Sequence, residues 1–102
     1  MDVKLAKPIT AHGQSVTSLT LAGPTAGDLF KSGVPFKVET VRDGGTRTVY
    51  DTGAIRNMIS RLANIPTSSV DMMTPGDFMK CANIIVNFTA SAPETSSIEP
   101  SN

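Results

Sequence analysis

The 102-residue chain has the length of one domain, and its apolar fraction of 39% is enough to build a single core. Nine basic residues balance nine acidic ones, so the chain lacks the excess positive charge that nucleic-acid binding normally needs. The single cysteine excludes an internal disulfide, and no stretch approaches the roughly 18–20 apolar residues that cross a membrane. We therefore expect an intracellular protein with neither a membrane nor a nucleic acid as its partner.

The N-terminal residues predict an antiparallel β-hairpin. Val3 and Leu5 alternate with polar neighbours, and the range 16–21 repeats this alternation with β-prone residues. Between the two runs, Ala11-His12-Gly13-Gln14 places a residue that tolerates positive φ before a glycine, which is typical of a tight turn. Because two strands alone are only marginally stable, we expect helices to cover one face of this hairpin.

A short helix of at most two turns is predicted after the hairpin. Thr25 can cap its start, and Asp28, three residues later, can complete a capping box. Gly33 ends the segment ahead of Pro35.

The range 36–50 allows two interpretations. Phe36, Val38 and Thr40 alternate with charged residues, and a similar alternation follows the turn signal Asp43-Gly44-Gly45. A second hairpin is the simpler reading and a mobile loop is the alternative, because strand propensity depends strongly on context.

The second half predicts a pair of helices joined by a turn. Asp51 can cap the first helix, which Asn64 and Pro66 end, and 68–73 can add one further turn. Its apolar residues recur at helical spacing: Ile55, Met58, Ile59 and Leu62.

The last helix begins at Thr74-Pro75-Gly76-Asp77, with threonine as its cap, and carries an apolar stripe. This stripe consists of Phe78, Cys81, Ile84, Ile85 and Phe88. The elements together predict one α+β domain over residues 3–90, in which the N-terminal hairpin packs with the short helix and the C-terminal helical pair. Residues 91–102 are rich in Ser, Pro, Glu and Thr and predict a disordered tail.

The residues that could carry chemistry are few and scattered. His12 lies in the predicted turn, and Cys81 lies on an apolar stripe, where a free cysteine is usually inert. The glycines at 44 and 45 match neither phosphate-binding pattern, and helix capping accounts for both Thr-x-x-Asp sequences. We therefore expect no catalytic residue, no cofactor and no metal site, and a protein that is not an enzyme.

Four methionines gather around the predicted corner between the two longer helices: Met58, Met72, Met73 and Met79. Methionine is flexible and is frequent on surfaces that accept varied apolar partners, so these four are the candidate partner-binding residues. The alternative is that they fill the core, as helical spacing predicts for Met58 and partly for Met79. Since Met72 and Met73 are adjacent, they cannot both face the same way on a helix.

The order and spacing of several segments resemble the tail assembly chaperones of Mu-like and P2-like bacteriophages. In the first half the matching residues are Leu5, Pro8-Ile9, Gly13 and Val16-Thr17-Ser18-Leu19-Thr20-Leu21, and the most specific match is Pro24-Thr25-Ala26-Gly27-Asp28-Leu29. In the second half they are Ile59, Leu62, Asn64-Ile65-Pro66, Asp77-Phe78 and Phe88. The resemblance covers about residues 3–90, and the departure from it is the stretch 36–51, which is longer and more polar than the family pattern.

This resemblance implies a non-enzymatic chaperone that binds the phage tape-measure protein and keeps it soluble until the tail tube polymerises around it. It also implies a protein of the host bacterial cytoplasm that is absent from the mature virion. The resemblance further implies that a frameshifted longer form can recruit the tail-tube protein. The sequence does not decide between a monomer and a homo-oligomer.

The alternative from the residues alone is a small phage-encoded regulator that binds a host protein or nucleic acid. Five basic residues could line one face of the strands: Lys4, Lys7, Lys37, Arg42 and Arg47. No aromatic platform for single-stranded nucleic acid accompanies them.

Overall fold

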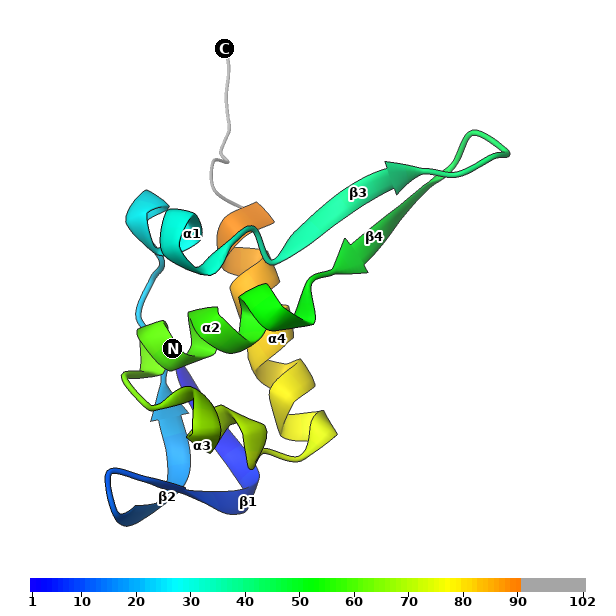
Figure 1. Ribbon diagram of the computed structural model, residues 1–102. Helices are drawn as coiled ribbons and strands as arrows, with labels where there is room; N and C mark the ends of the chain where they lie inside the picture. The colour runs from blue at the N-terminus through cyan, green and yellow to red at the C-terminus, as the bar shows by residue number, and fades with distance from the viewer. Residues whose placement is uncertain (91–102) are drawn as a thin grey trace.

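In the computed structural model, which describes residues 1–90, the chain forms two antiparallel β-hairpins and four helices (Figure 1). The elements in chain order are β1 (Asp2–Ala11), β2 (Gln14–Thr20), α1 (Ala26–Ser32), β3 (Phe36–Thr40), β4 (Thr46–Tyr50), α2 (Thr52–Ala63), α3 (Thr67–Asp71) and α4 (Pro75–Ala90). The predicted α+β fold class is confirmed, and 36–50 is a second hairpin rather than a loop. The predicted tail at 91–102 lies outside the described residues.

The first hairpin has a tight turn and a bulge. His12 (φ 55°) and Gly13 (φ 76°) both have positive φ, as a two-residue type I′ turn requires. The strand register shifts between Lys4 and Ile9, in a segment that contains Pro8, which has no N–H to donate to the ladder. On both sides of this bulge the odd-numbered residues face inward, and the buried ones are Val3, Leu5, Ile9 and Ala11.

The core lies between the first hairpin and helices α2 and α4. Its fully buried apolar side chains come from all three parts: Leu21 just after β2, Ile55, Met58 and Ile59 on α2, and Cys81 and Ile85 on α4. Burial of a Leu, Ile or Met side chain contributes about 1.5–3 kcal/mol. The packing of helices on the hairpin therefore provides the cover that the first hairpin needs.

Local signals set the helix ends where the sequence predicts them. The Asp51 carboxylate accepts a hydrogen bond from the N–H of Ala54 (3.0 Å), and the Thr74 hydroxyl accepts one from the N–H of Asp77 (3.1 Å). Helix α2 ends at Asn64, whose left-handed backbone (φ 56°) matches the cap conformation that asparagine tolerates.

The second hairpin extends away from the helices (Figure 1). Its strands pair in register from Phe36 opposite Tyr50 to Thr40 opposite Thr46. Gly44 adopts a positive φ of 92° in the turn, a conformation that glycine reaches without steric cost.

Candidate functional site

The structure separates the four candidate methionines into buried and exposed pairs. Met58 is 0% exposed and Met73 8%, whereas Met72 is 52% exposed and Met79 40%. Met58 is thus part of the core on α2 and does not reach the surface, as its helical spacing indicates. Met72 and Met73 face different ways, as expected for neighbours: Met72 is exposed, and Met73 is largely buried.

A groove of about 410 Å³ opens at the corner where the start of α2, helix α3 and the start of α4 meet. Its lining consists of Thr52, Gly53, Arg56, Val70, Asp71, Met73, Pro75, Phe78 and Met79. Five of these nine side chains are apolar, and the polar ones come from α2 and the end of α3. The groove is therefore an apolar surface with polar groups along one side, and Met73 and Met79 both contribute to it.

An ion pair joins the two helices on the polar side of the groove. Arg56 Nε donates to Asp71 Oδ1 (2.6 Å), and Nη2 donates to Oδ2 (2.9 Å). Because this pairing favours both charged forms, it lowers the pKa of Asp71 and raises that of Arg56. The two-point contact fixes the side chains relative to each other more firmly than a single hydrogen bond would.

Asp77 fixes the start of α4 against the bulge of β1. Its carboxylate accepts hydrogen bonds from the backbone N–H of Ala6 (2.9 and 3.0 Å) and of Lys7 (3.3 Å), and its side chain is 1% exposed. The Ala6 bond is the largest cause of the lowered pKa of Asp77, while burial opposes it. Capping therefore explains only part of the Thr-x-x-Asp sequence here, because the carboxylate satisfies N–H groups of a distant strand. The sequence carries no local signal for that contact.

Residues with reactive side chains serve the fold. His12 Nε2 donates to the carbonyl of Asn64 (2.9 Å), which joins the first turn to the end of α2. Cys81 is fully buried, and burial, followed by the nearby Asp77 charge, raises the pKa of its thiol to about 11. A thiol with this pKa carries almost no thiolate near neutral pH, which makes it a poor nucleophile.

Within residues 1–90, no three His, Cys, Asp or Glu side chains gather in a way that would hold a metal ion. No helix in this described part is long and apolar enough to span a bilayer.

The sequence model of one protein family matches residues 2–90, and its description reads phage tail assembly chaperone proteins, E, or 41 or 14. The chain belongs to this family. Neither the curated proteins nor the solved structures gave a match. The predicted resemblance is thereby confirmed, and the family is one of assembly chaperones, which act on other proteins during the building of the phage tail.

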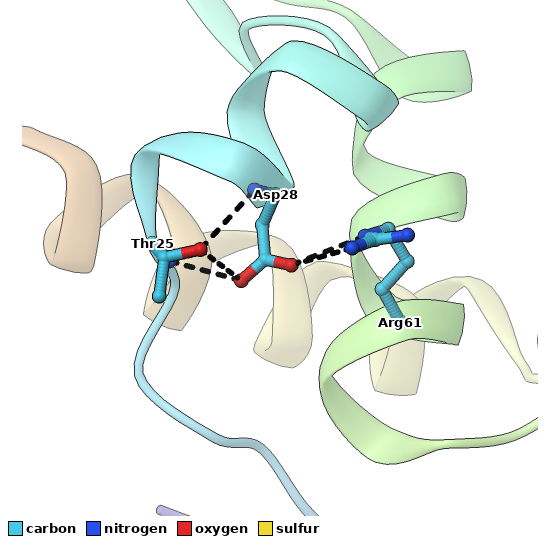
Figure 2. A network of polar contacts seen from close by, with 3 residues as sticks. All are labelled: Thr25, Asp28 and Arg61. Carbon is cyan, nitrogen blue, oxygen red and sulfur yellow. Dashed lines mark hydrogen bonds and ion pairs between the residues drawn. The ribbon is translucent and has the colours of Figure 1, made fainter.

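The most specific family-like segment of this tail assembly chaperone, 24–29, forms a structural clamp (Figure 2). The Thr25 hydroxyl accepts from the N–H of Asp28, and Asp28 Oδ2 accepts from the N–H of Thr25 (2.9 Å), which completes the predicted capping box. Asp28 Oδ1 also accepts from Nε (3.1 Å) and Nη2 (2.9 Å) of Arg61 on α2. The Thr25 backbone and then Arg61 are the main causes of the lowered pKa of Asp28. The signature thus holds α1 on α2, away from the groove.

The basic residues of the tail assembly chaperone do not form one face. Lys4 and Lys7 belong to the first hairpin, and Lys37 and Arg47 to the second, which lies at a different end of the molecule (Figure 1). Lys37 and Arg47 also both pair with Glu39, at 3.1 and 3.0 Å. The structure therefore does not gather these basic residues on one face of the strands, as the nucleic-acid alternative expected.

Proposed function

We propose that this tail assembly chaperone binds the phage tape-measure protein and keeps it soluble until the tail tube polymerises around it. The single observation that carries the proposal is the open apolar groove at the corner of α2, α3 and α4, in a protein of this family. The protein then acts in the host bacterial cytoplasm and is absent from the mature virion. Recruitment of the tail-tube protein by a frameshifted longer form belongs to the same proposal.

The chemistry of the groove suits a long helical partner with an apolar face. An amphipathic helix binds by placing apolar side chains at helical spacing into such a groove. Met79 is 40% exposed and unbranched, so it can adopt different rotamers against different partner side chains. Met72, next to Met73 in the chain, is 52% exposed and offers a second flexible apolar side chain outside the groove lining. A chaperone that coats many successive helical segments needs this tolerance more than it needs shape-specific anchors.

Co-expression with the tape-measure protein tests the proposal. The wild-type chain should keep the tape-measure protein in the soluble fraction and co-purify with it. The double variant Met72→Ser/Met79→Ser should weaken the association about ten-fold or more, because a methionine side chain that becomes buried on binding contributes about 1.5–3 kcal/mol. Its thermal midpoint should change little, because both side chains are exposed in the free protein.

The matched control is Phe30→Ser, which removes an apolar side chain on α1 that is 86% exposed and does not line the groove. It should leave co-purification unchanged. Loss of binding in the control but not in the methionine variant would place the binding site elsewhere. A tape-measure protein that stays insoluble beside the wild-type chain would contradict the function itself.

A further inference from the structure

The second hairpin is amphipathic, and both of its faces are open. Residues directly opposite in an antiparallel pair share a face, so Phe36, Val38 and Tyr50 lie together on one side. Val38 is 60% exposed and Tyr50 39%. The opposite side carries the charged residues, where Glu39 pairs with both Lys37 and Arg47.

The outer edge of β3 presents unpaired backbone groups. The N–H of Val41 donates to the carbonyl of Gly45 (2.8 Å), and the N–H of Asp51 donates to the carbonyl of Pro35 (2.9 Å). Since inter-strand bonds involve alternate residues, the odd-numbered residues of β3 bond to β4. The even-numbered ones turn their N–H and C=O outward, namely Phe36, Val38 and Thr40. The sheet has two strands in the described part of the chain, so no strand of residues 1–90 pairs with this edge.

A two-stranded hairpin without helical cover is marginally stable in water, and added strands stabilise it. We propose that the occupant of this edge is a second copy of the same chain, whose β3 pairs antiparallel with the first β3 about a two-fold axis at Val38. The product is a four-stranded sheet across the dimer. This inference goes beyond the proposed chaperone function and does not depend on it.

Charge complementarity selects this partner and this register. Pairing about Val38 places Lys37 of each copy opposite Glu39 of the other, which gives two opposite-charge pairs across the dimer. Both pairs fall at non-hydrogen-bonded positions, where opposite side chains lie closest. A parallel, in-register pairing would instead place like charges side by side. The equivalent pairing of β4 about Thr48 would place Arg47 opposite Val49, with no opposite charge. Because the β3 pairing is isologous, it closes as a dimer and does not propagate into fibres.

A proline scan of the two edges tests which edge associates. In Val38→Pro the lost N–H is one that points outward, so the variant blocks strand addition at β3 and spares the bonds to β4. The matched control is Thr48→Pro, which removes the outward N–H directly opposite on β4. By light scattering after size-exclusion chromatography, the wild type and Thr48→Pro should show twice the 10.7 kDa chain mass at high concentration, and Val38→Pro the mass of one chain.

Charge reversal tests the register. Lys37→Glu and Glu39→Lys each convert both cross-copy pairs into like-charge pairs and should weaken self-association about ten-fold. An equimolar mixture of the two variants restores both opposite-charge pairs and should associate as the wild type does. Arg42→Glu makes the same charge change in the turn, outside the pairing, and should leave self-association unchanged.

Three outcomes would overturn the proposal. One is a wild-type chain that remains monomeric up to millimolar concentration. Another is an equal loss of dimer in Val38→Pro and Thr48→Pro, since the edge of β3 would then have no special role. The third is that the two charge-reversal variants, each shown by circular dichroism to be folded, fail to associate when mixed. The register about Val38 would then be wrong.

Discussion

Asp77 joins the start of α4 to the bulge of β1, and the groove depends on that junction. The bulge leaves the N–H groups of Ala6 and Lys7 without partners in β2, and the buried carboxylate accepts both. Lys80 lies near the same carboxylate, with 3.4 Å between Nζ and Oδ1. A negative charge at this position thus aligns the helix that carries Phe78 and Met79.

We predict that Asp77→Asn destabilises the protein at neutral pH and flattens its acid unfolding. The folded pKa of Asp77 is lowered, so its contribution is fully present above the unfolded value of about 3.9 and is lost as the pH falls through the folded pKa. Denaturant midpoints measured from about pH 7 to about pH 2 should therefore converge for the variant and the wild type at the acid end. Asp43→Asn, in the exposed turn, is the control and should follow the wild-type curve. Parallel curves for Asp77→Asn would contradict the assignment.

At the scale of elements, α1 is a helix of seven residues that its cap and its neighbour hold in place. A helix this short does not form alone in water, because nucleation is costly and few backbone bonds follow it. The Thr25–Asp28 capping box supplies the missing partners at its start, and Arg61 ties the box to α2 (Figure 2). The family-like segment therefore stabilises the start of α1 and holds this helix against α2.

We predict that Thr25→Val destabilises the protein by about 1 kcal/mol, the usual effect of losing a helix cap. Valine keeps the shape of threonine but removes the hydroxyl that accepts from Asp28. Urea unfolding followed by circular dichroism measures the change. Thr17→Val, on an exposed part of β2, should shift the midpoint far less. An equal shift in both variants would mean that the cap has no particular role.

Elements governed by local signals were predictable from the sequence. The turn at His12 and Gly13, the caps at Thr25 and Asp51 and the hairpin alternatives for 36–50 all follow from residues within a few positions of one another. Features that depend on distant contacts were not. The sequence gives no indication that Asp77 reaches Ala6 or that the second hairpin projects from the body, because tertiary packing decides both.

The same distinction applies to the candidate site. Met58 was a candidate because it is a methionine near the predicted corner, although its helical spacing indicated burial. The structure shows it inside the core. The adjacency of Met72 and Met73 predicted that they face differently, but not which of them is exposed. The candidate methionines were placed at the corner between the two longer helices, and the structure shows a groove at this corner that α3 completes.

At the scale of the whole molecule, the groove and the base of the second hairpin adjoin at the start of α2. Thr52 lines the groove and also a hollow of about 720 Å³ at the base of the second hairpin. The core cluster includes Val70 and Met73 of the groove lining but none of the residues 36–50 of the second hairpin, so among the groove residues the exposed Met79 is the one to mutate without disturbing the core. A partner helix and a second copy of the chain would therefore meet the molecule on different surfaces, which Met79 and Val38 variants test separately. The family match spans residues 2–90, and the single domain over 3–90 stays a prediction.

If the groove binds the tape-measure protein, the methionine side chains that line it report the contact directly. With ¹³C-labelled methionine methyl groups, nuclear magnetic resonance gives a separate signal for each of the five methionines. On addition of a soluble tape-measure segment, the signals of Met73 and Met79, which line the groove, should shift, while that of the distant Met1 should stay in place. A shift of Met1 with unchanged Met73 and Met79 signals, under conditions where the segment binds, would contradict the account.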